Sequence, residues 1–216
     1  MEDTSYAADA ILAGADIASV AALKGKSVAY EEGATSELLL DAALKDNNMT
    51  IADITPVPMP ASDAGAALIA GQVDAAVTYE PYISEAMGND PALHVLYSGA
   101  DKPGLISDML AVHTPYATDN DATMHKLLQA WSAGVDFLRT YPDDGRAIIA
   151  KAVGSTPEEL ASAFDGIAFY NLDENLDMMT GNAVENLNIV AQSAISIGLI
   201  EQAPDFQRMV NPNFIQ

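Results

Sequence analysis

Three short apolar runs, each followed by an amphipathic stretch, alternate between residues 23 and 88. The runs are residues 27–30, 54–59 and 73–79. The stretches that follow them open at candidate capping or first-turn residues, namely Ser36, Ser62 and Pro81. Strand and helix repeated in this order with short connections predict an α/β fold with a parallel sheet flanked by helices.

The pattern becomes helical after about residue 115. Apolar residues three or four positions apart form one stripe from Met124 to Leu138 and a longer one from Leu172 to Ile197. Residues 106–113 resemble a further strand, and the first dozen residues give only a weak strand signal because they are rich in alanine. The second half of the chain is therefore predicted to be mainly helical.

The charge balance excludes several classes of partner. Nine Lys and Arg against 31 Asp and Glu give a formal net charge of −22, so the chain lacks the basic footprint that nucleic acid or an anionic membrane surface requires. An apolar fraction of 50% is too high for a disordered acidic tail. The chain has no cysteine, which excludes disulfides and thiolate chemistry. The remaining expectation is a folded protein that handles a small molecule.

The first candidate site is the loop after the first predicted strand. In α/β sheets, ligands bind beyond the carboxyl ends of parallel strands, which selects residues 31–36, 60–62 and 78–82. Gly33, Ala34, Thr35 and Ser36 combine a flexible turn, two hydroxyls and the start of a helix, which suits an anionic head group. The same residues also fit an ordinary turn with a helix cap. Residues 1–138 contain no arginine, so an anion there must rest on backbone N–H groups, hydroxyls or a lysine.

The loop after the third predicted strand points to a different ligand. Tyr79 and Glu80, together with Tyr30, provide aromatic faces and a carboxylate that suit an amine or a pyrimidine-like precursor. The alternative is that Glu80 caps the following helix and the tyrosines are packed. Both alternatives stay open at this point.

An enzyme is the third class considered. The three histidines, His94, His113 and His125, are not at metal-ligand spacing, and no nucleophile elbow, phosphate loop or dinucleotide fingerprint occurs. Glu31 and Glu80 are the remaining candidates for acid–base chemistry. We therefore expect no enzyme activity, no catalytic residues, no cofactor and no metal.

Three segments in a fixed order carry a family resemblance. They are Leu-Lys-Gly-Lys-Ser-Val-Ala at 23–29, Gly-Ala-Thr-Ser at 33–36 and Ala-Leu-Ile-Ala-Gly-Gln-Val-Asp-Ala-Ala-Val-Thr-Tyr-Glu-Pro at 67–81. Together they strongly resemble the solute-binding proteins of ABC importers, nitrate/sulfonate/taurine type, and the ending at 205–216 is similar as well. The resemblance covers essentially the whole chain, which corresponds to about the last two thirds of the family pattern.

The resemblance implies a periplasmic-binding-protein-like fold of two lobes. Residues 20–105 would form the ligand-binding lobe two. Residues 1–19 and 106–216 would form the remainder of lobe one, helix-rich and incomplete because the N-terminal part of that lobe is lacking. An apolar face left uncovered in this way predicts association either with a second copy of the chain, as a homodimer, or with the missing part of lobe one.

The resemblance also implies a function and site residues. The protein would capture a small organic anion, such as a sulfonate, taurine or nitrate, in an interlobe cleft outside the cytoplasm and deliver it to a membrane permease. Thr35 and Ser36 match the loop that contacts the head group, and Tyr79 matches an aromatic wall. Asp108 matches an acidic residue where the chain crosses between lobes, and Ser5 matches a hinge residue that lines the cleft.

Overall fold

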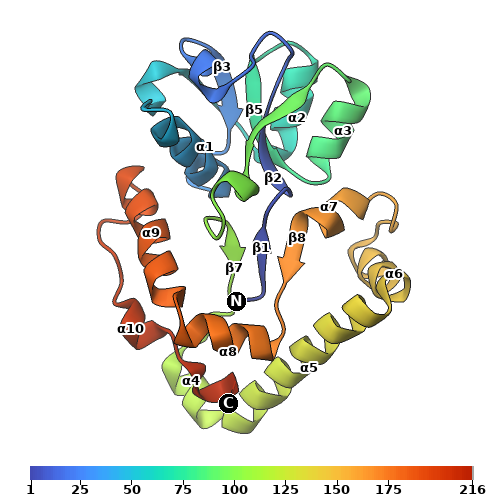
Figure 1. Cartoon of the computed structure of the whole chain (residues 1–216), viewed down its shortest axis with the longest axis vertical. Coiled ribbons are helices and arrows are strands. Elements are labelled where there is room, and N and C mark those ends of the chain that lie inside the picture. The colour runs from blue at the N-terminus through green and yellow to red at the C-terminus, as the bar shows by residue number, and fades with distance from the viewer. Residues whose placement is uncertain (216) are drawn as a thin grey trace.

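A five-stranded mixed sheet forms the centre of the upper half of the molecule in Figure 1. The structure is a computed structural model and describes residues 1–215. The strand order is β4 (Thr55–Pro58), β3 (Ser27–Tyr30), β5 (Ala75–Tyr79), β2 (Asp9–Ala13) and β6 (His94–Ser98). β3 is parallel to β4 and β5, whereas β2 is antiparallel to both β5 and β6.

Both faces of this sheet are buried, because alternate side chains of one strand point to opposite faces. Ile11 and Val28 join the apolar cluster on the side of α1 (Thr35–Asp46), whereas Leu12 and Ala29 join the cluster under α2 (Ala61–Ile69) and α3 (Tyr82–Asn89). Three short 3-10 helices complete this half, namely η1 (Val20–Leu23), η2 (Ile51–Asp53) and η3 (Gly99–Asp101). The core of the molecule is this helix–sheet–helix sandwich.

A small antiparallel sheet links the two halves. Its order is β7 (Ser107–Asp108), β1 (Asp3–Ser5) and β8 (Ile167–Phe169). The segment between β1 and β2 crosses from this sheet to the large one, and the N–H groups of Tyr6 and Ala7 both donate to the carbonyl of Gly166, at 2.8 and 3.0 Å. The chain therefore passes between the halves along hydrogen-bonded strands rather than through a loose linker.

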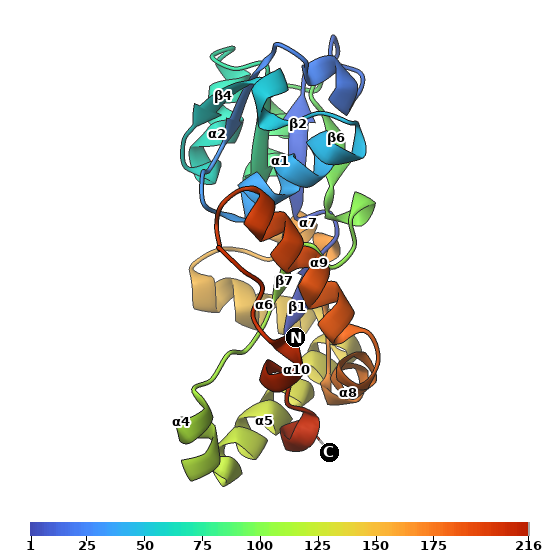
Figure 2. The ribbon, with the colours of Figure 1, turned by 90° about the vertical axis from the view of Figure 1, so that its left-hand side faces the viewer.

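The lower half is built from helices around the small sheet (Figure 1). They are α4 (Thr114–Asp119), α5 (Asp121–Thr140), α6 (Pro142–Val153), α7 (Ala161–Gly166), α8 (Leu172–Thr180), α9 (Ala183–Ser196), α10 (Phe206–Met209) and the 3-10 helix η4 (Pro212–Ile215). α9 returns to the upper half, where Ser196 contacts Asp41 of α1 at 3.1 Å (Figures 1 and 2). None of the helices within residues 1–215 is both long and apolar enough to cross a membrane.

The predicted α/β fold with flanking helices is confirmed, with several corrections. The sheet is mixed rather than wholly parallel, because β2 enters it antiparallel between β5 and β6. Residues 9–13 pair with β5 and β6 in the large sheet, and the lobe bounds 1–19, 20–105 and 106–216 stay a prediction. The strand predicted at 106–113 is only two residues long, and the long helix predicted from 172 to 197 is divided between α8 and α9 around Gly181.

Candidate ligand site at the ends of the sheet strands

The carboxyl ends of β3, β4 and β5 bring three helix N-termini to one edge of the large sheet. Tyr30 of β3 is the register partner of Pro58 of β4, and the side chain of Glu31 reaches the first residue of α2. The loops 31–34, 59–60 and 80–81 are thus neighbours, as the sequence predicted for a ligand-binding edge.

The α1 loop is held in place by its own side chains. The Ser36 hydroxyl accepts the N–H of Glu31 at 2.9 Å and donates to the carbonyl of the same residue at 3.0 Å. Gly33 has a φ of +77°, which favours glycine, and its N–H donates to the carboxylate of Glu37 at 2.7 Å. The Ser36 side chain is therefore buried, and its hydroxyl is already engaged in the two hydrogen bonds to Glu31 that hold the loop together.

The first N–H groups of α1 remain open. The residue before the helix is Ala34, which provides no side-chain cap, and within residues 1–215 no acceptor reaches the N–H of Thr35 or Ser36. Thr35 itself is exposed. Because the uncapped start of an α-helix carries a partial positive charge, these donors suit the oxygens of an anion.

The two neighbouring helices are already capped by carboxylates. The N–H of Ala61, which opens α2, donates to the Glu31 carboxylate at 3.1 Å. The N–H and the hydroxyl of Ser84 in α3 donate to Glu80 at 3.1 and 3.0 Å. Ser62 in α2 and Tyr82 and Ile83 in α3 also have N–H groups without an acceptor within residues 1–215. The start of α1 differs from the other two in that no carboxylate accepts an N–H of its first turn. The sequence left capping of α3 as an alternative role for Glu80. In that role the Glu80 carboxylate already accepts hydrogen bonds from Ser84, although an amine ligand would need the same carboxylate.

The tyrosines of the site lie in different environments. Tyr79 is 39% exposed and packs edge-on against Tyr82, with ring centroids 5.3 Å apart. Burial raises its pKa, and the nearby Tyr82, Glu31 and Asp9 raise it further. Tyr30, by contrast, is 4% exposed and belongs to the core cluster under α1. The structure brings Tyr79 to the loops and leaves Tyr30 in the core.

Ser5 and Asp108 lie at the crossing between the halves, in a cluster of acidic residues. Asp3 of β1 is the register partner of Asp108 of β7. Burial raises the pKa of Asp3 to about 6, with Asp108, Glu2 and Asp9 adding to the shift. These carboxylates repel one another, so negative charge is disfavoured at the crossing between the halves.

Asp9 lies between the crossing segment and the edge of the large sheet where β5 ends. Burial raises the pKa of Asp9 and Asp108 raises it further, while the nearby Ser5 hydroxyl lowers it by favouring the charged form. That hydroxyl is buried and makes no well-formed hydrogen bond within residues 1–215. Asp9 is also the register partner of Tyr79. Asp3 and Asp9 were missed by the sequence reasoning, and acidic residues on either side of the crossing segment were the only signal that pointed to them.

The two lysines that precede β3 are paired with carboxylates, so backbone N–H groups are the donors that remain for an anion at this edge of the sheet. Lys24 pairs with Asp53 at 3.2 Å and Lys26 with Asp74 at 3.5 Å, at the opposite ends of the strands. Glu31 and Glu37 sit in or beside the α1 loop. An anion at this edge would therefore be bound by directed N–H groups rather than by net positive charge.

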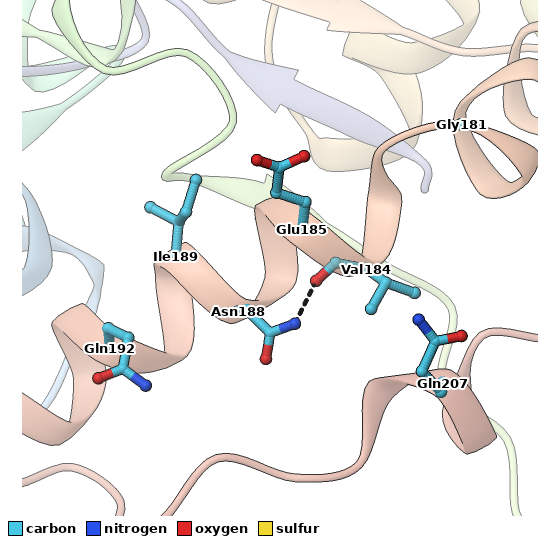
Figure 3. Close-up of a pocket in the computed structure, with 7 residues that line it drawn as sticks. All are labelled: Gly181, Val184, Glu185, Asn188, Ile189, Gln192 and Gln207. Atoms are coloured by element: carbon cyan, nitrogen blue, oxygen red, sulfur yellow. Dashed lines mark hydrogen bonds between the residues drawn. The ribbon is translucent and has the colours of Figure 1, made fainter.

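Two hollows lie elsewhere on the molecule. One of about 520 Å³ runs along α9, where Gln207 of α10 lies opposite Val184 and Asn188 (Figure 3). The other, of about 380 Å³, is lined by Arg139 and Arg146 together with apolar residues of α5, α7 and β8.

Both arginines of the second hollow are already paired. Arg139 donates to Glu174 at 2.9 Å, and Arg146 donates to Asp165 at 2.6 Å and lies over the ring of Phe164. Neither hollow therefore offers a free cation to an anionic ligand. Within residues 1–215, no three His, Asp or Glu side chains are grouped closely enough to hold a metal ion.

The arrangement of the two halves is the periplasmic-binding-protein fold. The periplasmic aliphatic sulphonate binding protein SsuA from Escherichia coli superposes with a TM-score of 0.78 at 27% identity, covering 97% of this chain and 68% of that one. The family described as NMT1/THI5 like matches residues 3–145, and the chain belongs to this family.

Curated relatives are longer than this chain. An aliphatic sulfonates-binding protein of Escherichia coli (strain K12) is 34% identical over 149 residues, which are 69% of this chain and 46% of the relative. A binding protein of Brucella abortus (strain 2308) is 24% identical over 145 residues, again 46% of the relative. The chain thus spans about half the length of the curated relatives that it matches.

The fold is also found in an enzyme. The desulfurization enzyme DSZB superposes with a TM-score of 0.71 at 14% identity, covering all of this chain and 77% of the enzyme. At this identity the likeness concerns the fold alone. The relatives named above are binding proteins, and the fold by itself does not distinguish binding from catalysis.

Proposed function

We propose that this chain is a solute-binding component of an ABC-type importer and that it captures a small organic sulfonate. The family assignment and the sulfonate-binding relatives support this proposal. The observation that carries it is the start of α1, where the N–H groups of Thr35 and Ser36 have no acceptor, whereas a carboxylate accepts one N–H at the start of each neighbouring helix. A sulfonate group has three oxygens that accept hydrogen bonds from such donors.

In this proposal each residue of the edge has a definite role. The N–H groups of Thr35 and Ser36 bind the sulfonate oxygens, Ser36 and Glu37 hold the loop in shape, and Tyr79 lies beside the organic part of the ligand. The protein binds and releases its ligand without chemical change. A membrane permease is the proposed acceptor of the ligand, and the proposed location is periplasmic, as in the Escherichia coli relative.

The decisive test removes one N–H while keeping the helix. Proline is tolerated at the first position of a helix, and Ala34 has the extended backbone that a residue before proline needs, so Thr35→Pro deletes the donor with little strain. We expect it to weaken the binding of ethanesulfonate about tenfold or more, measured by isothermal titration calorimetry. Thr35→Ala, which keeps the N–H, is the matched control and should weaken binding less.

Two outcomes bear on the site. Equal affinities for ethanesulfonate in wild type and Thr35→Pro, with unchanged far-UV circular dichroism, would show that the α1 start does not bind the head group. Glu80→Gln should leave ethanesulfonate affinity nearly unchanged, because Glu80 caps α3. A large loss in Glu80→Gln, together with binding of ethylamine by wild type, would instead favour an amine ligand.

A further inference from the structure

The segment 109–112, which directly follows β7, is apolar and exposed. The side chains of Met109, Leu110 and Val112 are 42%, 43% and 37% exposed, and Ala111 between them is exposed as well. The main-chain N–H and C=O groups of these four residues form no hydrogen bond with another main-chain group within residues 1–215. In Figure 2 the chain between β7 and α4 runs alone along one side of the lower half.

The composition of this segment is typical of a strand that is covered on both faces. Met, Leu, Ala and Val follow one another without a polar residue, whereas a strand with one face in water alternates apolar and polar residues. β7 nevertheless ends at Asp108, and it is an edge strand of the small sheet. The segment thus has the composition of an interior strand but continues an edge.

The hydrogen bonds of β7 show which of its main-chain groups face away from β1. The carbonyl of Asp108 accepts the N–H of Glu2 at 2.8 Å, so Asp108 directs its main-chain groups toward β1. Successive residues of an antiparallel strand direct these groups to opposite edges. If β7 continues, Met109 and Ala111 therefore direct their N–H and C=O groups to the open edge, where a further strand would lie.

Two other sheet edges are less suited to a further strand. At the far edge of the small sheet, the carbonyl of Phe169 in β8 already accepts the guanidinium of Arg139 at 2.6 Å. At one edge of the large sheet, β4 contains Pro56 and Pro58, which have no N–H to donate. The edge at β7 has neither of these features.

We propose that residues 107–112 bind, as one continuous strand, to a β-strand in a polypeptide equivalent to the part of SsuA that this chain does not match. The superposition covers 97% of this chain but 68% of SsuA, so about a third of SsuA is left unmatched. Such a polypeptide contributes main-chain hydrogen bonds along the edge and further elements that cover the two apolar faces.

A second copy of this chain fits the segment less well. Two copies paired edge to edge would share main-chain hydrogen bonds, but both faces of each apolar segment would stay in water. The proposal does not depend on the sulfonate site, which lies at the edge of the large sheet.

The first experiment measures binding of the unmatched part of SsuA, produced as a separate polypeptide, by isothermal titration calorimetry. We expect a complex of one copy each. Ala111→Pro deletes an N–H that faces the open edge and should weaken binding about tenfold. Ala111→Val keeps this N–H and favours a strand, so it is the matched control and should bind at least as tightly as wild type.

The second experiment does not require the separate polypeptide to fold alone. The same part of SsuA is joined ahead of residue 1, and amide hydrogen exchange is followed by mass spectrometry in peptides that cover residues 108–113. We expect exchange of residues 109–112 to be at least about tenfold slower than in the 216-residue chain.

Three outcomes would overturn the proposal. They are equal affinities of wild type and Ala111→Pro, unchanged exchange in the joined chain, and protection of residues 109–112 that grows with the concentration of the 216-residue chain alone. The last of these would assign the edge to a second copy. Ethanesulfonate binding by Ala111→Pro reports separately on the ligand site.

Discussion

Residues 9–105 and residues 106–215 differ in where their large apolar side chains lie. Both core clusters take their buried members from residues 10–105, where strands and helices cover each other on two faces of one sheet. In the second region most elements are helices around a three-stranded sheet of two- and three-residue strands. Side chains such as Ile148 and Val153 stay 60% and 66% exposed there.

The difference shows which part of the chain has a complete core. A sheet covered on both faces buries nearly every apolar residue of its strands, whereas a helix buries only one stripe unless other elements surround it. The open start of α1 and Tyr79 are placed by the region with the complete core. The side chains of Leu127, Phe137 and Ile148, which are 50%, 40% and 60% exposed, belong to the other region.

The largest difference that we expect between the two regions is in the free energy of unfolding that is lost when one apolar side chain is truncated. Leu39→Ala removes a fully buried side chain of α1 and should lower the free energy of unfolding by about 3 kcal/mol. Ile148→Ala removes an exposed side chain and should lower it by less than about 0.5 kcal/mol. Urea unfolding followed by far-UV circular dichroism measures both. Equal losses would mean that α6 is packed as tightly as α1.

A second contrast concerns carboxylates that accept backbone N–H groups. Asp74 accepts the N–H of Ser27 at 2.8 Å and its hydroxyl at 2.7 Å, which joins β3 to the start of β5 across the sheet. These bonds lower the pKa of Asp74. Asp74→Ala should therefore lower the free energy of unfolding by about 1–2 kcal/mol.

The matched variant in the second region is Glu159→Ala. Glu159 accepts the hydroxyl of Ser155 and the N–H of Thr156, but it joins residues only three or four positions apart in an exposed turn. We expect no measurable change in the unfolding midpoint. A loss as large as that of Asp74→Ala would show that local bonds stabilise the helical region as much as bonds across the sheet stabilise the other.

The features that could be predicted from the sequence are those that depend on residues close together in the chain. Local pattern and turn chemistry predict the strand at 27–30, the turn at Gly33 and the start of α1. The loop that joins β3 to α1 could therefore be predicted from the sequence. The antiparallel entry of β2 and the pairing of Asp9 with Tyr79 depend on contacts between distant segments, which periodicity does not encode. The burial of Tyr30 was indicated by its position two residues after Val28, on the same face of the strand.

A further effect, smaller than those expected for Leu39→Ala and Asp74→Ala, lies where the two regions meet. Burial and the neighbouring carboxylates raise the pKa of Asp3 from its ordinary 3.8 to about 6. The native state then binds more protons than the unfolded state between these values, so stability falls as the pH rises from about 4 to about 6 and stays lower above that range. Asp3→Asn should remove this loss and raise the free energy of unfolding at pH 7.5 by about 1 kcal/mol, after allowance for solvent screening of a half-buried group.

The sign of this effect distinguishes the Asp3 carboxylate from an exposed carboxylate elsewhere on the molecule. Urea unfolding of wild type and Asp3→Asn at pH 4 and pH 7.5 should give nearly equal stabilities at the lower pH and a more stable variant at the higher one. Asp63→Asn, at an exposed position in the first turn of α2, is the control and should be no more stable than wild type at either pH, because a carboxylate there stabilises the start of the helix. If Asp3→Asn were less stable than wild type at pH 7.5, the ionised carboxylate would be stabilising the crossing strands, and the repulsion inferred between Asp3 and Asp108 would be wrong.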